Sequence, residues 1–386
     1  MRVGILSEST PGERRVAATP QTAATFIDWG WQVDLEAGAG TRAGFPDDQY
    51  TEAGANVVDG HTARSASVVL CVNPPEQIDD LTAGAALVGF LDPFVDIELV
   101  TRLQNNRITA LAVEAIPRTT LAQSMDALSS QANIGGYAAA LLAAMNSPKL
   151  LPMMVTAAGT IPPSRALILG VGVAGLQAIA TARRLGAVVH AYDIRPETKE
   201  QVESLGAKFV AAPTEEMDEG GYAKEVGRDT QAAQHAALAP HVTEADIVIT
   251  TAQIPGRPAP LLITDEIVAG MKPGSVIVDM AADSGGTVAA SKPDEVVEFS
   301  GVHIYGPTNL PAQIPHDASR MYARNLVALL ERTRDDDSFR IDLDDEIIGG
   351  TTITHQGEVI HPRTRQVLGL AEHQTDRAEE PEGDTE

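Results

Sequence analysis

The sequence predicts an α/β protein with two doubly wound parallel sheets, in which one domain is inserted into the other. Short β-branched runs alternate with longer helical segments, as they do in βαβ units. The 386 residues are enough for roughly two to three domains. A second alternating block begins near Arg165, and a late helix is expected to return the chain to the first block.

The elements are expected in the following order. Apolar runs rich in Val, Ile and Leu predict strands in the first block at residues 3–6, 31–36, 67–72 and 108–113. Longer segments between them predict helices at 21–29, 97–105 and 133–146. In the second block the same criteria predict strands at 166–169, 188–192, 208–210, 247–250, 275–279 and 303–306, and helices at 174–185 and 197–205. The late helix that returns the chain to the first block is expected at 318–330.

These elements define the expected domains. Residues 1–132 and 310–370 form a discontinuous N-terminal domain, and residues 133–309 form the inserted one. The tail 371–386 is charged, contains Pro and Gly and has no apolar periodicity, so we expect it to be disordered.

Composition excludes several classes of function. With 28 basic and 53 acidic residues the formal charge is −25, which disfavours nucleic acids and anionic membranes as partners. The single cysteine, Cys71, excludes a disulfide framework and a multi-thiolate metal site, and the scattered histidines predict no metal site either. The longest uncharged stretch, 127–148, is too short and too polar to span a bilayer, and no signal peptide is present, so we expect a cytoplasmic protein without direct membrane insertion. Excess carboxylate with only 6 Lys suggests a high-salt cytoplasm.

The strongest motif is a glycine-rich turn, Gly170-Val171-Gly172-Val173-Ala174-Gly175. It follows the predicted strand 166–169 and opens a predicted helix, which is the context that a Rossmann-like dinucleotide site requires. Gly170 permits the tight turn, Gly172 lets the backbone approach a pyrophosphate, and Gly175 lets helix and strand pack closely. The helix N-terminus attracts the anion.

The residues after the next strand suggest which nucleotide binds. Asp193 lies 18 residues after Gly175, where a carboxylate can accept hydrogen bonds from the adenosine ribose and repel a 2′-phosphate. NAD is therefore favoured over NADP. Arg195 lies close by and is a residue type that can pair with a 2′-phosphate.

Two further segments are candidates. Gly220 and Gly221 followed by Tyr222 suggest a lid that closes over a ligand, or else an ordinary surface loop. The polar stretch 117–131 offers side chains that could bond a carboxamide or ribose across an interdomain cleft. Within it, Asp126 and Ser129 could equally be helix caps. The four candidates there are Arg118, Gln123, Asp126 and Ser129.

Together these residues carry a resemblance. The chain resembles the NAD(H)-binding component (domain I, the alpha or alpha1 subunit) of proton-translocating NAD(P) transhydrogenases over nearly its whole length. The matching stretches are GILSESTPGERRVAATP, PRTTLAQSMDALSSQANIGGYAA, LGVGVAGLQAIATARRLGAVVHAYDIRP, GGYAKE, TTAQIPGRPAPLLIT and MKPGSVIVDMA. RTTLAQSMDALSSQ and GGYAKE are specific to this family, and the rest is shared with alanine dehydrogenases.

The resemblance implies a homodimer with NAD(H) in an interdomain cleft, and separate membrane-spanning and NADP(H)-binding subunits. It implies an Re/Si-specific hydride transfer from NADH to NADP⁺ held on a partner subunit, coupled to proton translocation. The chain would be peripheral on the inner face of the cell membrane, held there by those partner subunits.

The resemblance also implies roles for individual residues. The turn from Gly170 to Gly175, including Val171 and Val173, would take the pyrophosphate. Arg118, Gln123, Asp126 and Ser129 would orient the nicotinamide and its ribose. The remaining nucleotide contacts would come from Asp193, Ile194, Arg195, Gly221, Tyr222, Gln234, Thr251, Ala252 and Gln253.

The chain departs from the transhydrogenase pattern at three positions. Leu121 and Ala138 stand where the family usually has Arg, and Gln253 stands where it usually has an apolar residue. These changes bear on partner contacts more than on NAD binding.

Two alternatives stay open. An alanine dehydrogenase shares Glu8 and Arg15, but its Lys and His acid/base pair is replaced near Cys71 and Asp92, which cannot polarise and protonate a keto acid. A non-enzymatic NAD-binding sensor or assembly subunit would need only the adenosine end of the site.

Overall fold

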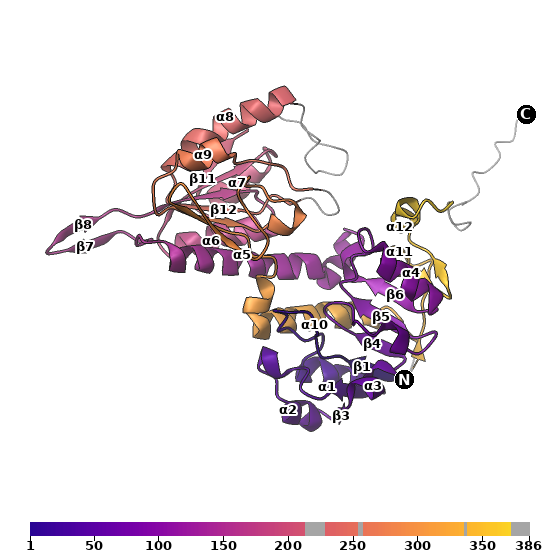
Figure 1. Ribbon diagram of the computed structural model, residues 1–386. Coiled ribbons are helices and arrows are strands. Elements are labelled where there is room, and N and C mark those ends of the chain that lie inside the picture. The colour runs from indigo at the N-terminus through magenta and orange to yellow at the C-terminus, as the bar shows by residue number, and fades with distance from the viewer. Residues whose placement is uncertain (213–227, 254–257, 336–337, 372–386) are drawn as a thin grey trace, which may run out of the picture. The chain divides into compact units, whose positions relative to one another are not determined.

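The computed structural model describes residues 1–212, 228–253, 258–335 and 338–371. The chain forms two compact units, Met1–Ser130 with Pro315–Glu386, and Gln131–Ile314. The second unit is thus inserted into the first, and both are α/β, as the sequence predicts (Figure 1). The expected lid around Gly221 and Tyr222 and almost all of the expected tail lie outside the described residues.

The first unit is built on an eight-stranded sheet in the order β19-β18-β6-β5-β4-β1-β2-β3. The six strands β1 to β6 are parallel and follow the 3-2-1-4-5-6 order of a Rossmann-like sheet, while β18 and β19 are added antiparallel. The strands are β1 (Arg2–Ile5), β2 (Gln32–Glu36), β3 (Asn56–Val58), β4 (Val68–Leu70), β5 (Ala86–Gly89), β6 (Thr109–Ala112), β18 (Thr352–His355) and β19 (Glu358–Val359).

Both faces of this sheet are buried. Val68 and Leu70 point into one apolar cluster, which contains Phe26 and Tyr322, whereas Val69 between them belongs to the opposite cluster. Burial on both faces explains the continuous apolar strands. The helices of this unit are α1 (Pro20–Asp28), α2 (Asp47–Glu52), α3 (Gly60–Arg64), α4 (Ile97–Asn105), α10 (Pro315–Glu331), α11 (Glu346–Thr351) and α12 (Pro362–Val367). Its 3-10 turns are η1 (Thr41–Ala43), η2 (Ile78–Asp80), η3 (Val113–Ala115) and η4 (Thr120–Met125). A small ribbon is formed by β16 (Arg334–Asp335) and β17 (Ser338–Phe339).

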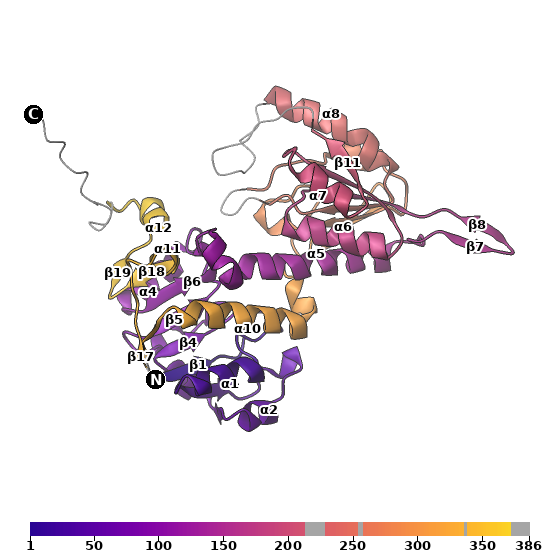
Figure 2. The same ribbon diagram turned by 180° about the vertical axis from the view of Figure 1, so that it is seen from behind.

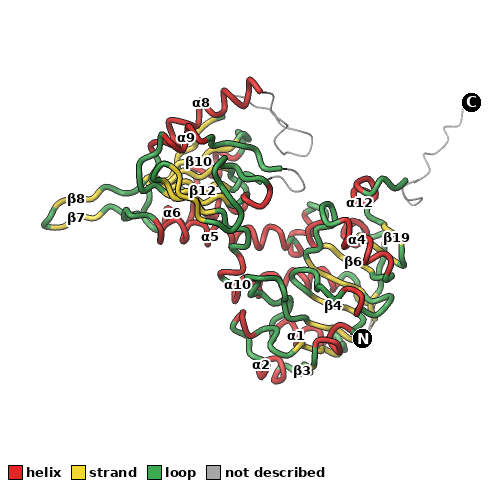
Figure 3. The backbone as a smooth tube through the Cα atoms, viewed as in Figure 1, coloured by secondary structure: helices red, strands yellow, loops and turns green. Residues whose placement is uncertain are grey.

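The second unit repeats the same plan. Its seven-stranded sheet has the order β11-β10-β9-β12-β13-β15-β14, which is again 3-2-1-4-5-6 with the antiparallel β14 at one edge. The strands are β9 (Arg165–Leu169), β10 (Val188–Asp193), β11 (Lys208–Ala211), β12 (Ile247–Thr250), β13 (Val276–Asp279), β14 (Val296–Phe299) and β15 (Val302–Tyr305). Helices α6 (Val173–Arg184), α8 (Arg228–Glu244) and α9 (Asp265–Ala269) accompany them (Figure 3). They are joined by α7 (Thr198–Ser204) and by the turns η5 (Ala282–Ser284) and η6 (Pro311–Gln313).

Helix α5 (Ala127–Asn146) begins six residues earlier than the expected residue 133. The reason is local, because Asp126 accepts a hydrogen bond from the Ser129 amide at 2.8 Å and so caps the helix. Residues 127–132, expected to precede the helix, therefore form its first turns.

A two-stranded hairpin, β7 (Met154–Thr156) and β8 (Gly159–Ile161), extends from the second unit as an arm (Figures 1 and 2). The sequence did not predict it. All six of its strand residues are exposed, and Met154 pairs with Ile161 across the hairpin. The base of the arm is fixed, since Ser164 donates to the Leu150 carbonyl at 2.8 Å and Leu151 is buried.

Candidate nucleotide-binding site

The glycine-rich turn lies between β9 and α6, and each glycine has its own reason to be there. Gly170 has φ +91°, and a Cβ on it would lie 2.9 Å from the Ala252 amide. A Cβ on Gly175 would lie 2.0 Å from the Gly170 carbonyl oxygen, so close packing of helix on strand excludes any side chain. A Cβ on the exposed Gly172 would meet nothing within 4 Å. The first two glycines therefore serve the fold, while Gly172 faces open space.

The open space lies at the N-terminus of α6. Gly172 is the N-cap residue, with extended backbone, and no side chain caps this helix. Its first-turn N–H groups and positive dipole end suit an anionic group such as a diphosphate. The residues present thus fit the dinucleotide that the motif implies.

Asp193 ends β10 and ties it to the glycine turn. Its Oδ2 accepts from the Val171 amide at 2.7 Å, and its Oδ1 accepts from the Arg195 amide at 2.9 Å. The Arg195 guanidinium also binds this carboxylate, with Nε 3.0 Å from Oδ1. Because Arg195 is engaged with Asp193, it is a poorer receptor for a 2′-phosphate, which favours NAD over NADP.

Further candidate residues lie at the carboxyl edge of the same sheet. Thr251 follows β12 and its hydroxyl donates to the Gly170 carbonyl at 2.9 Å, so this residue also shapes the turn. Gln253 is exposed. Gln234, expected at the nucleotide, is buried on α8 and donates to the Tyr192 hydroxyl at 2.8 Å. Ile194 is partly buried against the core of the second unit.

Asp279 was not a candidate from the sequence, yet it organises this edge. It ends β13, is fully buried, and accepts from the Thr250 hydroxyl at 2.8 Å and the Thr287 amide at 3.0 Å. The available signal was its position at the end of a predicted strand, the same position that Asp193 occupies in β10. Its bonds hold the loop after β13 in place.

The nicotinamide-side candidates lie in the first unit, on or beside η4. Arg118 and Gln123 are exposed. Asp126 accepts from the Ser129 amide at 2.8 Å and from the Ser129 hydroxyl at 2.5 Å. In the structure this pair therefore caps the helix, as one of the two interpretations of the sequence predicts. Capping leaves a ligand role for either residue a prediction.

The residues shared with alanine dehydrogenases form a buried polar cluster at the strand ends of the first sheet. The Arg15 guanidinium is held by both oxygens of Glu13, with N–O distances of 2.8 and 2.7 Å. Glu8 accepts from the backbone amides of Val72 at 2.6 Å and Asn73 at 3.0 Å. Burial outweighs these bonds and raises the pKa of Glu8 to about 7.

Cys71 and Asp92, near the expected places of the dehydrogenase Lys and His, do not form an acid/base pair. Burial raises the pKa of the fully enclosed Cys71 thiol, so the thiol stays neutral. Asp92 is exposed and has φ +48°. Beside it, burial raises the pKa of Glu114 to about 7, and this carboxylate accepts from the Leu91 amide at 2.7 Å.

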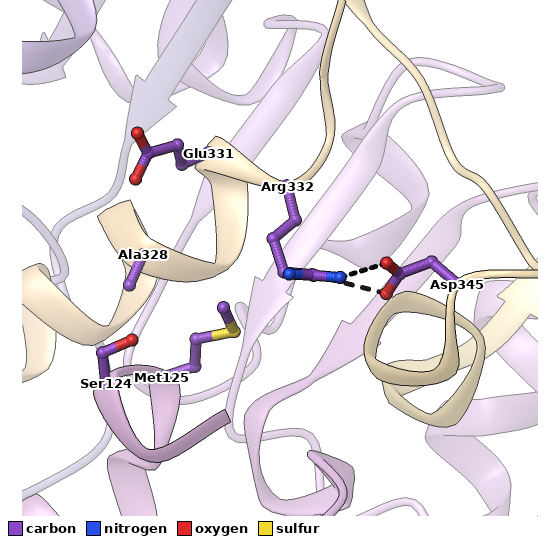
Figure 4. A pocket seen from close by; sticks show the side chains of 6 residues that line it. All are labelled: Ser124, Met125, Ala328, Glu331, Arg332 and Asp345. Atoms are coloured by element: carbon purple, nitrogen blue, oxygen red, sulfur yellow. Dashed lines mark hydrogen bonds and ion pairs between the residues drawn. The ribbon is translucent and has the colours of Figure 1, made fainter. Parts of the chain in front are cut away.

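A shallow pocket of about 460 Å³ lies beside η4 (Figure 4). One side is Ser124 and Met125, and the other is closed by the Arg332–Asp345 ion pair between α10 and the start of α11. The pocket includes none of the sequence-predicted site residues. Within the described ranges, no group of three or more His, Cys, Asp or Glu could hold a metal ion, and no helix is long and apolar enough to cross a membrane.

Fold and site together define a dinucleotide-binding protein made of two Rossmann-like units. Family models agree: "Alanine dehydrogenase/PNT, N-terminal domain" matches residues 4–135 and "Alanine dehydrogenase/PNT, C-terminal domain" matches residues 139–362. The chain belongs to the alanine dehydrogenase/PNT family.

Within this family the chain is more similar to transhydrogenase subunits than to dehydrogenases. The first part of NAD(P) transhydrogenase subunit alpha from Rhodospirillum rubrum is 44% identical over 377 residues, covering 94% of this chain and 98% of the relative. Alanine dehydrogenase 1 of Staphylococcus aureus is 29% identical over 371 residues, covering 93% and 94%. Among solved structures, a transhydrogenase from Sinorhizobium meliloti has a TM-score of 0.86 at 44% identity, covering 93% of this chain and all of that one. An L-alanine dehydrogenase has a TM-score of 0.79 at 27% identity, covering 96% and 99%.

Proposed function

We propose that this chain is the NAD(H)-binding subunit of a proton-translocating transhydrogenase. The observation that carries the proposal is its 44% identity to a transhydrogenase alpha-subunit chain across 98% of that relative's length, against 29% to alanine dehydrogenase. The open helix N-terminus at Gly172 supports nucleotide binding independently of the resemblance.

The residues of the chain would divide the work as follows. The first turn of α6 binds the pyrophosphate, and Asp193 accepts the adenosine ribose hydroxyls. On the nicotinamide side, Gln123 and Arg118 orient the ring, with Asp126 and Ser129 supporting its ribose. The bound NADH supplies a hydride, which leaves its C4 with the electron pair and joins C4 of an NADP⁺ held by a partner subunit.

The cluster around Arg15 supports this reaction over alanine oxidation. Direct transfer between two nicotinamides needs orientation and exclusion of water but no proton transfer by the protein. Oxidation of an amino acid requires a group that binds the carboxylate and an acid/base pair. Here Arg15 is paired with Glu13, and Cys71 is buried and neutral.

We further propose that the subunit is a homodimer that uses the β7–β8 hairpin. Residues 150–164 contain no charged side chain, although the chain carries a net charge of −25. Met153 and Val155 are 62% and 69% exposed, and Met154 and Ile161 are also exposed. An isolated hairpin is only marginally stable in water, and unprotected edge strands normally carry charges or Pro. A neutral arm is the surface on which a second, equally acidic copy can dock with little charge repulsion.

Sedimentation measurements test the dimer. Val155→Asp is expected to shift the chain to monomer, whereas Val95→Asp, at a position 65% exposed in the first unit, leaves it dimeric. A wild-type chain that is monomeric at micromolar concentration would refute the proposal.

The catalytic assignment is tested by following hydride transfer from NADH to an NADP⁺ analogue, with and without the NADP(H)-binding subunit. A parallel reaction contains L-alanine and NAD⁺. Transfer that requires the partner, with no reaction on alanine, is expected. Alanine-dependent NADH formation by the chain alone would identify an alanine dehydrogenase instead, and silence in both reactions would favour a sensor or assembly role. Membrane association is expected only when the membrane-spanning subunit is present.

A further inference from the structure

The turn η4 carries Gln123 at its surface and is an unusual support for a residue that must be held precisely in place. It is a 3-10 helix of six residues, whereas runs beyond three or four are uncommon because their hydrogen bonds are poorly aligned. Gln123 and Ser124 are exposed, and the weak Asp126 N–H to Gln123 carbonyl contact is 3.4 Å long. The turn therefore needs support from outside itself.

That support comes from α10, about two hundred residues further along the chain. Met125 and Ala122 pack into the apolar cluster that also holds Leu326 and Leu329 of α10. The Asn325 side-chain amide, 8% exposed as a residue, donates to the Ser124 carbonyl at 2.8 Å.

Asn325 also binds the beginning of α5. Its Oδ1 accepts from the Ser130 hydroxyl at 2.7 Å, so one side chain joins the end of η4 to the first turn of the helix. The two anchor points, Ser124 and Ser130, lie on either side of the capping pair Asp126 and Ser129 and next to Gln123. All three of these candidate nicotinamide residues are thus held within one short span.

We infer that Asn325 is a positioning residue for nicotinamide orientation, acting through η4 and the start of α5 without touching the nucleotide itself. The inference rests on the proposed function, because it assigns Asn325 a role in placing Gln123. A buried amide with both its oxygen and its nitrogen bonded to one corner fixes the angle of that corner. Displacement of a reacting group by about 1 Å can slow a transfer by about a hundredfold.

Three variants separate positioning from mere stability. Asn325→Leu removes both bonds at nearly unchanged volume. Ser130→Ala removes the bond from Ser130 to Asn325 and keeps the bond from Asn325 to Ser124, and it also removes the 3.2 Å contact of the Ser130 hydroxyl with the Ala127 carbonyl. Ser319→Ala is the matched control, since this buried hydroxyl also lies on α10 but accepts from the Val16 amide at 3.0 Å and donates to the Pro315 carbonyl at 2.6 Å, neither of which belongs to η4 or α5.

The measurements are single-turnover hydride transfer in the reconstituted complex at saturating NADH, NADH affinity, and hydrogen exchange of the η4 amides. For Asn325→Leu we expect transfer to slow by about tenfold to a hundredfold while the NADH dissociation constant changes less than about threefold, with faster exchange at Ala122 and Asp126. Ser130→Ala should show a smaller change in the same direction. Ser319→Ala should lose some stability and keep the wild-type transfer rate.

Two results would overturn the inference: unchanged transfer in both Asn325→Leu and Ser130→Ala, or equal slowing in Ser319→Ala. If the wild-type complex transferred no hydride, the proposed function would fail and with it the positioning role. The exchange measurement would then still show whether Asn325 holds the turn, so the two failures are distinguishable.

Discussion

Replacing glycines of the α6 turn by alanine separates binding from folding within one motif. Gly172→Ala adds a methyl group that meets no protein atom within 4 Å, and Gly172 has φ −83°, which alanine adopts freely. Stability should therefore change by less than about 0.5 kcal/mol. The methyl group would stand where the backbone is expected to approach the pyrophosphate, so NADH affinity should fall at least about tenfold, or about 1.4 kcal/mol.

Gly175→Ala should behave in the opposite way. Its Cβ would lie 2.0 Å from the Gly170 carbonyl oxygen and 3.0 Å from the Thr251 hydroxyl, far inside van der Waals contact with backbone that cannot rotate away. Overpacking of this kind costs about 1–3 kcal/mol, and a backbone clash belongs at the upper end. The main effect should thus appear in unfolding, and any loss of NADH binding should follow from displacement of α6.

The assay is urea unfolding of the purified chain combined with NADH fluorescence titration of each variant. Wild-type affinity in a fully folded Gly172→Ala protein would show that no phosphate approaches this helix end, and would refute the assignment of the site. A Gly175→Ala protein as stable as the wild type would show that the packing argument is wrong.

Three more predictions concern single side chains. Gln123→Asn should slow hydride transfer far more than it weakens NADH binding; an equal loss in both, measured by stopped flow and titration, would contradict an orienting role. Asp193→Ala should weaken NADH binding about tenfold and reduce the preference of the site for NADH over NADPH, because it removes the ribose acceptor and the ion pair that engages Arg195. Unchanged relative affinities for NADH and NADPH in paired titrations would count against the ribose assignment. The pKa of Glu8 is raised from 4.5 to about 7, so above pH 4.5 the native state retains a proton that the unfolded state loses. The stability that this retained proton contributes is full below pH 4.5 and is lost as the pH rises through 7. Glu8→Gln should remove about 3 kcal/mol of that pH dependence, seen as a flatter curve of unfolding free energy between pH 5 and 8; parallel curves for both proteins would refute it.

Much of the fold was predictable because local pattern and tertiary environment agree. The predicted strand at 247–250 and helix at 97–105 match β12 and α4 to the residue. Each has the environment that its sequence pattern assumes: every residue of β12 is buried, and α4 has one apolar face. The fold class and its insertion are confirmed by the structure and by its solved relatives.

Elements outside these patterns were missed for physical reasons. β5 reads Ala-Leu-Val-Gly and lacks the β-branched enrichment of its neighbours, although it is fully buried in the middle of the sheet. The two strands of the hairpin show no alternation of apolar and polar residues, since both faces of the hairpin carry exposed apolar side chains. α8 has apolar residues spread around its circumference and Pro240 inside it.

The candidate site was predictable in residue type but not in contacts. The turn from Gly170 to Gly175 and its acidic partner Asp193 follow from spacing alone, because they lie on consecutive elements of one unit. Asn325 carries no motif, and its bonds to Ser124 and Ser130 join residues about two hundred positions apart. Contacts between residues so far apart in the sequence depend on how the elements are arranged in the fold, and local sequence patterns do not determine that arrangement.

The polar cluster of the first unit shows how one scaffold can serve both branches of the family. Arg15 gives two of its five N–H donors to the buried Glu13, and separating this pair would leave an uncompensated buried charge at a cost of about 3–5 kcal/mol. Glu8, with its raised pKa, faces backbone amides and Asn73 rather than a base. These bonds hold the ends of β1 and β4 in place. The hydride transfer that we propose for this chain needs no proton donor from the protein, so it makes no demand on this cluster, and the proposal assigns the nucleotide to the second unit.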